Sequence, residues 1–198
     1  MRIGYRLSTS IIRFLMKILF GMKIVGSIKM DNTRPGIIAA NHQSYFDPPF
    51  LGSVLNEEVF FLAKKELFNN KIFAKLIKYY NTIPIKRGVL DKTGFEHCEQ
   101  ILKNNNLIMI FPEGSRKSFS AKAGIGKIAM DTNAVIYPVK IENITDLKGC
   151  ILRKKRLTFI FGEPIEPEYY QHWDKKKANY QKLADKILSE INKLSIML

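Results

Sequence analysis

The chain has 198 residues, of which 46% are apolar and 25% charged, and its formal net charge at pH 7 is +14. These proportions are those of one globular domain with a sizeable core, and they exclude a disordered chain. The charge indicates an anionic partner, such as nucleic acid, anionic lipid or a phosphorylated small molecule. No zinc-finger, basic-zipper or RNA-recognition signature accompanies it, which argues against nucleic acid.

Cysteine and histidine are too sparse for a disulfide framework or a zinc site. Cys98 and Cys150 match no metal-binding spacing, and His42, His97 and His172 lie far apart in the chain. We therefore expect no zinc site and a reducing cytosolic environment.

Residues 1–22 predict an amphipathic helix rather than a signal peptide or a membrane span. Basic residues interrupt its apolar stretch, which falls short of the roughly 18 uncharged residues that a span requires. Apolar and basic residues recur on separate helical stripes: Leu7, Ile11, Leu15, Ile18 and Met22 on one, and Arg2, Arg6, Arg13 and Lys17 on the other. Such a helix can lie in the headgroup region of an anionic bilayer, or it can pack on its own domain. The additional residues Phe14, Leu19 and Phe20 widen the apolar face and favour the membrane.

After residue 22, short apolar runs that are typical of strands alternate with helical stretches. The runs are 23–30, 36–41, 58–64, 81–86, 106–111, 134–141 and 156–162, and the helix candidates lie near 48–55, 66–79, 90–104, 120–131 and 175–197. GIIAA and LIMIF are continuously apolar, as strands covered on both faces are. The alternation predicts an α/β fold in which a mostly parallel or mixed sheet of about seven strands is flanked by helices. We expect one domain over residues 23–198, preceded by the N-terminal helix.

Polar segments follow three of these runs. His42 follows 36–41, Arg87 follows 81–86, and the segment PEGSRK (112–117) follows 106–111. In open α/β sheets, ligands bind outside the carboxyl ends of the strands. If the three strands are neighbours, one pocket holds a histidine, a guanidinium and a glycine loop.

His42 and Asp47 allow two interpretations. Asp47 followed by Pro48 can simply begin a helix, with His42 as a hydrogen-bonded loop residue. Alternatively, a loop folds Asp47 back onto His42, since residues five apart on a helix are rotated by about 500° and do not share a face. The carboxylate would then hold the tautomer in which the imidazole removes a proton from a hydroxyl. No G-x-S-x-G motif supplies a nucleophilic serine, so a substrate hydroxyl would attack directly.

The two later segments carry groups that suit a phosphate. Arg87 and Arg116 offer forked donors, and Gly114 would allow backbone amides to approach closely. Either segment alone could be an ordinary strand exit or turn. The order of all the segments is the stronger signal.

The ordered blocks NHQSYFD, IPIKR, FPEGSR and YPV resemble the glycerolipid acyltransferase family, especially bacterial 1-acylglycerol-3-phosphate acyltransferases of the PlsC type. The resemblance runs from about residue 25 to residue 165. It implies that His42 and Asp47 form a catalytic dyad and that Arg87 binds the phosphate of the acceptor. The third block, Glu113, Gly114, Ser115 and Arg116, would help to hold the same phosphoglycerol.

The resemblance also assigns two further residues. Pro138 would lie on the acyl-donor side, and Lys64 in FLAKKEL would stabilise the oxyanion, with Lys65 as the alternative. Ser115 stands where the family usually has threonine, a change that keeps the hydroxyl. Many members also carry a longer N-terminal hydrophobic region.

The implied reaction transfers an acyl group from acyl-CoA or acyl carrier protein, as co-substrate, to the free hydroxyl of lysophosphatidate. It gives phosphatidate and requires no metal and no cofactor. The implied location is the cytoplasmic face of the cell membrane, with peripheral or monotopic attachment. Three alternatives stay open at this point: an acyltransferase for another lysophospholipid, an acyl-thioester hydrolase, and a non-catalytic basic protein that binds membrane or nucleic acid by charge. The headgroup, the acyl-chain length, the donor and the oligomeric state are also open.

Overall fold

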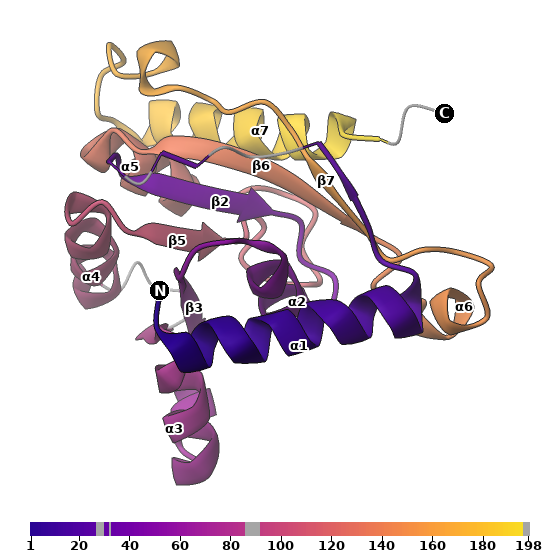
Figure 1. The fold of residues 1–198 in the computed structure, drawn as a ribbon. Helices are drawn as coiled ribbons and strands as arrows, with labels where there is room; N and C mark the ends of the chain where they lie inside the picture. Colours follow the sequence, from indigo (N-terminus) through magenta and orange to yellow (C-terminus); the bar gives the residue numbers. More distant parts are fainter. Residues whose placement is uncertain (27–29, 32, 86–91, 196–198) are drawn as a thin grey trace.

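The protein folds around one seven-stranded sheet with helices on both faces, as a computed structural model describes it over residues 1–26, 30–31, 33–85 and 92–195 (Figure 1). The strands are β1 (Lys23–Val25), β2 (Gly36–Ala40), β3 (Val59–Lys64), β4 (Thr82–Ile85), β5 (Leu107–Ile110), β6 (Val135–Glu142) and β7 (Thr158–Phe161). The α-helices are α1 (Ile3–Phe20), α2 (Asp47–Val54), α3 (Lys71–Tyr79), α4 (Lys92–Lys103), α5 (Ala123–Thr132), α6 (Leu147–Ile151) and α7 (Lys177–Lys193). Two short 3₁₀ turns, η1 (Lys65–Phe68) and η2 (Pro167–Tyr169), complete the described elements.

The strand order is β1-β7-β6-β2-β5-β3-β4. All neighbouring strands pair in parallel except β6 and β7, which are antiparallel. The predicted fold class, a mostly parallel mixed sheet of seven strands flanked by helices, is therefore confirmed. The carboxyl ends of β6, β2, β5, β3 and β4 lie at the same edge of the sheet.

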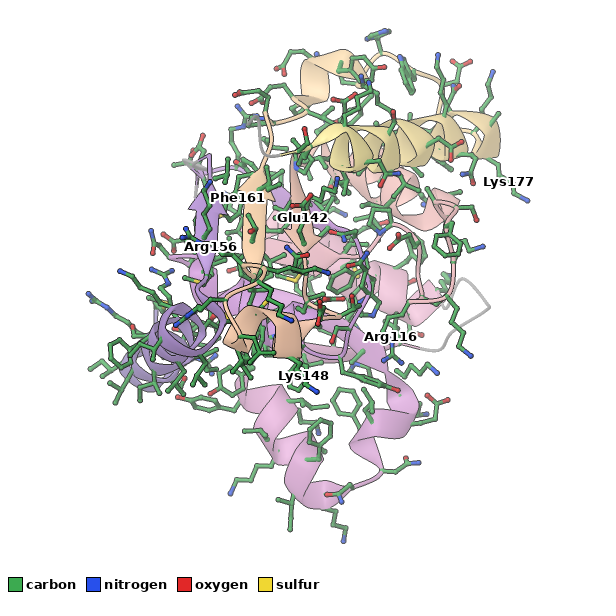
Figure 2. The ribbon with its side chains drawn as sticks, turned by 90° about the vertical axis from the view of Figure 1, so that its right-hand side faces the viewer. Arg116, Glu142, Lys148, Arg156, Phe161 and Lys177 are labelled. Atoms are coloured by element: carbon green, nitrogen blue, oxygen red, sulfur yellow. The ribbon has the colours of Figure 1, made fainter. Side chains whose placement is uncertain are left out.

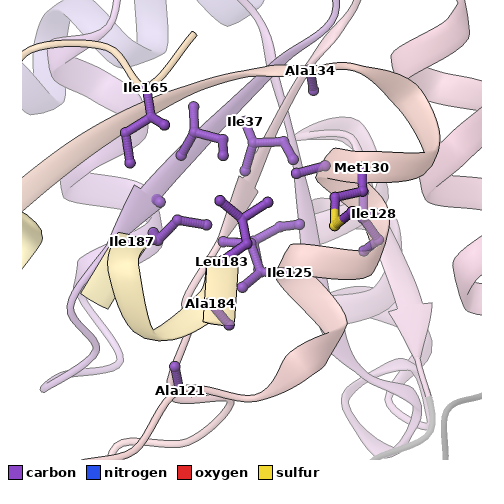
Figure 3. Close-up of a cluster of buried hydrophobic side chains, with 14 of the residues drawn as sticks. Ile37, Ala121, Ile125, Ile128, Met130, Ala134, Ile165, Leu183, Ala184 and Ile187 are labelled. Carbon is purple, nitrogen blue, oxygen red and sulfur yellow. The ribbon is translucent and has the colours of Figure 1, made fainter. Parts of the chain in front are cut away.

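The two faces of the sheet carry separate apolar clusters, because successive side chains of a strand point to opposite faces. Ile37 packs with α4, α5 and α7, in the cluster that Figure 3 shows. Ile38, the next residue of β2, packs with α1, α2 and α6 on the other face. The central strands β2 and β5 are buried on both sides, as their continuously apolar sequences predict.

The N-terminal helix α1 is fixed to the domain at both ends. At its start, Arg2 donates hydrogen bonds to the Glu58 carboxylate, the Tyr79 carbonyl and the Asn81 side chain. Burial alone would raise the pKa of Glu58, but the hydrogen bonds from Arg2 and Asn81 lower it to about 2. At the other end, Arg153 donates to the carbonyl of Ile18 in the last turn of α1.

The face of α1 that packs on the domain is not its predicted apolar stripe. Tyr5, Thr9 and Met16 are the buried residues of the helix. The apolar residues that remain exposed are Ile3, Leu7, Ile11, Phe14, Leu15, Ile18 and Leu19. No helix in the described part of the chain is long and apolar enough to cross a membrane.

Two local differences from the sequence prediction have simple causes. The helix expected over 66–79 is divided into η1 and α3, because the Asn70 side chain accepts the N–H of Phe73 and starts a new helix. The short helix α6 was not predicted, since five residues are too few to show a periodic pattern. Asp146 begins it by accepting the N–H of Gly149.

Candidate active site

The loops after β2 and β5 meet at the carboxyl edge of the sheet, because these strands are parallel neighbours with Ala39 opposite Ile110. Figure 2 views the molecule from this side and labels Arg116, in the loop after β5, and Glu142, at the end of β6. Strand β3 lies between β5 and β4. The three strands that precede the predicted segments are therefore not all neighbours, although their carboxyl ends share one edge.

His42 and Asp47 are directly hydrogen-bonded, with 2.7 Å between Nδ1 of the imidazole and Oδ2 of the carboxylate. The loop folds Asp47 back onto the histidine, and Asp47 is also the first residue of α2, so features of both interpretations occur together. The same Oδ2 accepts the backbone N–H groups of Gln43 and Ser44 at 2.6 and 2.7 Å. With Nδ1–H donating to the carboxylate, Nε2 of His42 keeps its lone pair and can accept a proton.

The base of this loop is held by Asn41, a buried polar residue. Its side-chain amide donates to the carbonyl of Ile141 at 3.0 Å and accepts the N–H of the same residue at 2.7 Å. Asn41 thereby continues the pairing of β2 with β6 for one residue beyond the strand. On the other side, the ring of Phe111 stacks on His42, with 4.2 Å between the ring centroids.

Glu113 links the two loops. Its Oε2 accepts the backbone N–H of His42 at 2.7 Å, and its side chain is buried. Burial raises the pKa of Glu113, and the neighbouring Asp47 carboxylate raises it further. The hydrogen bond from the backbone N–H of His42 acts in the opposite direction and lowers this pKa. The carboxylate thus contacts the histidine backbone, where it supports the loop.

The remainder of the loop after β5 is a turn followed by a cation. Gly114 has φ = 68°, in the left-handed region that favours glycine, and its N–H donates to the carbonyl of Phe111. Ser115 accepts the N–H of Ser118 through its carbonyl. The guanidinium carbon of Arg116 lies 3.3 Å from the centroid of the Tyr45 ring, which belongs to the His42 loop. Arg116 is therefore held against the His42 loop by stacking.

An open hollow of about 400 Å³ lies on the β6 side of the His42 loop. Asn41 and Gln43 form one wall, and Lys140, Glu142 and Lys155 are among the residues of the other. Among the residues that the structure describes, no group of three or more histidine, cysteine or acidic side chains could hold a metal ion.

A model of the Acyltransferase family matches residues 21–142 of the chain. The chain belongs to the acyltransferase family. The match includes β2, α2, β3, β5 and all of β6, and thus both loops of the candidate site.

Known proteins of this family agree with the match. The chain is 33% identical over 163 residues to the 1-acyl-sn-glycerol-3-phosphate acyltransferase of Streptococcus pneumoniae, covering 80% of this chain but only 60% of that relative. It is 25% identical over 196 residues to the enzyme of the same name from Bacillus subtilis, covering 96% of this chain and 98% of the relative. The fold matches the crystal structure of the 1-acyl-sn-glycerophosphate acyltransferase PlsC from Thermotoga maritima with a TM-score of 0.63 at 22% identity, over 97% of this chain and 83% of that one.

Two further predicted site residues, Lys64 and Pro138, belong to the strands β3 and β6. Lys64 ends β3 with an exposed side chain, and no hydrogen bond joins it to the described dyad. Pro138 is buried inside β6 opposite Ala39, and its carbonyl accepts the N–H of Gly162. Its predicted role on the donor side stays a prediction. Arg87 lies outside the described residues.

Sequence reasoning did not single out Asn41, Tyr45 or Phe111. Asn41 and Tyr45 lie within the NHQSYFD block, and Phe111 begins the block FPEGSR. The blocks were identified from the sequence, but no role was assigned to these three residues. Their contacts depend on the neighbouring strands β5 and β6, which no local pattern specifies.

Proposed function

We propose that this protein is a 1-acyl-sn-glycerol-3-phosphate acyltransferase. It transfers an acyl group from a thioester, acyl-CoA or acyl carrier protein, to the free hydroxyl of lysophosphatidate and forms phosphatidate. The hydrogen bond between His42 Nδ1 and Asp47 Oδ2, at the carboxyl edge of the sheet and in the loop that also contacts Arg116 through Tyr45, carries the proposal. The names of the relatives from Streptococcus pneumoniae and Bacillus subtilis support the choice of acceptor.

The dyad acts as a general base and then as a general acid. Nε2 of His42 takes the proton of the acceptor hydroxyl while the oxygen attacks the thioester carbonyl carbon. Asp47 orients the ring and stabilises the imidazolium that forms. The tetrahedral intermediate collapses as the carbon–sulfur bond breaks, and the departing sulfur receives the proton from Nε2. Lys64 is our candidate for the group that stabilises the oxyanion.

Arg87 and Arg116 are assigned to the phosphate of the acceptor, since a guanidinium can bind two phosphate oxygens at once. Gly114 and Ser115 form the turn that precedes Arg116. Glu113 fits this group less well, because its carboxylate would repel a phosphate and already accepts the His42 N–H. We assign Glu113 the positioning of the His42 loop instead.

The donor approaches from the β6 side, where the hollow beside Asn41 contains Lys140 and Lys155. Pro138 lies on the same strand, and we assign it an indirect role: it shapes the end of β6, which borders the hollow. The acceptor then binds on the opposite side of the His42 loop, where Arg116 lies.

Residues 1–22 form the membrane-surface element and residues 23–198 the acyltransferase domain. The exposed apolar face of α1, opposite its packed face, enters the interfacial region of an anionic leaflet. The net charge of +14 favours the same surface. The attachment is peripheral or monotopic, on the cytoplasmic face of the cell membrane, where the lysophospholipid acceptor lies.

The test is the initial rate of thiol release from acyl-CoA and from acyl carrier protein, with lysophosphatidate, with lysophosphatidylcholine and without acceptor. We expect release to require lysophosphatidate and to match phosphatidate formation. Equal release without acceptor would identify a thioester hydrolase, and a preference for the choline lipid would rule out a phosphomonoester acceptor. Unchanged rates in a His42→Ala variant would remove the dyad from the mechanism.

A further inference from the structure

Helix α3 exposes most of its apolar side chains. Ile72 is 86% exposed and Leu76 52%, and Phe73 and Tyr79 are exposed as well. Ala74 is the one buried residue of this nine-residue helix. A helix of a globular domain normally turns its apolar stripe toward the core. The stripe of α3 faces away from the core.

The exposed stripe of α3 is continuous and has lysines along one side. At about 100° per residue, Tyr79, Ile72, Leu76 and Phe73 occupy an arc of about 120°, nearly opposite the buried Ala74. The next arc consists of Lys71, Lys75 and Lys78, all exposed.

Helix α1 has the same arrangement around its axis. Its packed residues include Tyr5 and Met16, and its exposed apolar arc lies on the opposite side. The basic residues of α1, among them the exposed Arg6 and Lys17, lie between its packed arc and its exposed apolar arc. They follow the packed arc in the same rotational direction as the lysines of α3 do. Two helices on different parts of the chain therefore repeat one order of packed, basic and exposed apolar arcs.

The two helices are also neighbours. Arg2 donates to the carbonyl of Tyr79, the last residue of α3, at 2.8 Å. The rings of Tyr5 in α1 and Tyr80 just after α3 lie 5.6 Å apart. Figure 1 shows α3 beside the N-terminal half of α1, extending away from the sheet. The beginning of α1 thus lies next to the end of α3.

We propose that α3 is a second membrane-inserting element, which enters the interfacial region of an anionic leaflet next to α1. Ile72, Phe73 and Leu76 contact the acyl chains, and the three lysines contact anionic headgroups. A bilayer fits better than a protein partner because it can cover both helices at once and complements their basic arcs. Two helices with different directions fix how the domain is oriented on the membrane, which one helix leaves free to rotate. This inference rests on the membrane part of the proposed function and goes beyond it, since that part involves α1 alone.

The test compares vesicle binding of full-length variants by sedimentation, with phosphatidylcholine vesicles that contain or lack phosphatidylglycerol. The α3 variant carries Ile72→Ser and Leu76→Ser, and the α1 variant carries Ile11→Ser and Ile18→Ser. Phe119→Ser is the matched control, because Phe119 is 92% exposed and lies next to α7, on the other face of the sheet. We expect the α3 variant to bind about tenfold more weakly or worse, and the control to bind like wild type.

The lysines provide a second variant that does not depend on the apolar changes. Replacing Lys71, Lys75 and Lys78 together by Gln should weaken binding to vesicles with phosphatidylglycerol by about tenfold or more and leave binding to pure phosphatidylcholine nearly unchanged. Lys177→Gln is the matched control, since Figure 2 shows Lys177 at the far end of the molecule from α3. Thermal unfolding should be similar for all variants.

The outcomes separate this proposal from the proposed function. If the α1 variant dissociates while both α3 variants bind like wild type, α3 is not a membrane element and α1 alone holds the protein. If all variants bind like wild type, membrane attachment through either helix is wrong. If wild type forms dimers in the absence of vesicles and the α3 variant is monomeric, the stripe is a contact between copies of the chain and the proposal fails.

Discussion

The two loops that meet at the candidate site are held in place in different ways. The loop after β2 is fixed by buried side chains: Asp47 accepts three hydrogen bonds and Asn41 makes two to Ile141. The loop after β5 relies on a glycine turn, and its Arg116 rests on the exposed ring of Tyr45. Glu113 connects the two loops.

This difference matches what each loop has to do. Proton transfer requires the base to lie within hydrogen-bond reach of its partner, so small displacements are costly. Binding a phosphate through charge tolerates more movement, because the attraction declines gradually with distance. We therefore expect changes in the loop after β2 to lower kcat and changes in the loop after β5 to raise KM. Glu113 is the exception, because it belongs to the loop after β5 but supports the His42 loop, so its loss should lower kcat.

The largest effect is expected from the base itself. His42→Ala should lower kcat by about 10²-fold or more, the size of a general-base contribution, without changing thermal stability much. His97→Ala is the matched control, because His97 is exposed on α4. The measurement is the rate of phosphatidate formation at saturating acceptor. Turnover near that of wild type would exclude His42 as the base.

Asp47→Asn should cost less than His42→Ala, because the histidine remains but its tautomer is less well fixed. The carboxylate also accepts the N–H groups of Gln43 and Ser44, which an amide oxygen can partly replace. The loss should appear in kcat and leave the KM for lysophosphatidate nearly unchanged. A change confined to KM would show that Asp47 contributes to acceptor binding and not to proton transfer.

Removing a phosphate-binding arginine should act on the acceptor alone. Arg87→Ala and Arg116→Ala should each raise the KM for lysophosphatidate by roughly ten- to a hundredfold, the value of one charge-assisted contact of about 1.5–3 kcal/mol. The corresponding lysine variants should recover only part of the loss, since a point charge cannot bind two oxygens in the same way. Thiol release by water, without acceptor, should hardly change. An equal effect on lysophosphatidylcholine would exclude the phosphate role.

The sequence predicted the strands of this fold well because their signals are local. The continuously apolar runs became the doubly buried β2 and β5, and all seven predicted strands are present in the sheet. The strand order is not a local property. Nothing in the run TIPIK shows that β3 separates β4 from β5, so the condition that the three strands are neighbours is met for β2 and β5 but not for β4.

The candidate site was predictable for residue types and less so for contacts. A histidine near an aspartate after a buried strand indicated the pair, and the structure joins them at 2.7 Å. The glutamate of the third block was expected near a phosphate, but its contact with the His42 N–H depends on how two loops approach each other. The two loops meet because β2 pairs with β5, and the spacing of residues within either loop does not predict this pairing.

The contribution of Glu113 to the free energy of unfolding should depend on pH. Burial raises its pKa above the ordinary value of 4.5. The folded state therefore favours the neutral acid, and wild type should lose stability as pH rises from about 4.5 through the raised pKa. Glu113→Gln has no such titration, so its unfolding free energy should increase relative to wild type over that window and then level off. Chemical denaturation at several pH values measures this, and a difference independent of pH would contradict it.

The activities of two Glu113 variants separate its positioning role from a charge effect. Gln keeps an oxygen that can accept the His42 N–H, so Glu113→Gln should retain more activity than Glu113→Ala. The loss in the alanine variant should lie in kcat, because the displaced group is the base. If both variants instead raise the KM for lysophosphatidate equally, Glu113 belongs to acceptor binding, as the resemblance first implied.

The smallest effect is expected at Tyr45, whose ring supports Arg116 from the other loop. A cation–π contact at an exposed site is worth about 0.5–1 kcal/mol, so Tyr45→Ala should raise the KM for lysophosphatidate about two- to fivefold with little change in kcat. Tyr45→Phe keeps the ring face on which the guanidinium lies, at 3.3 Å from the centroid, and should resemble wild type. In an Arg116→Ala background, Tyr45→Ala should raise this KM less than it does in wild type, because the stacked guanidinium is gone. An undiminished effect of Tyr45→Ala in that background would show that the ring contacts the acceptor itself and that the second loop does not depend on the first for the position of its cation.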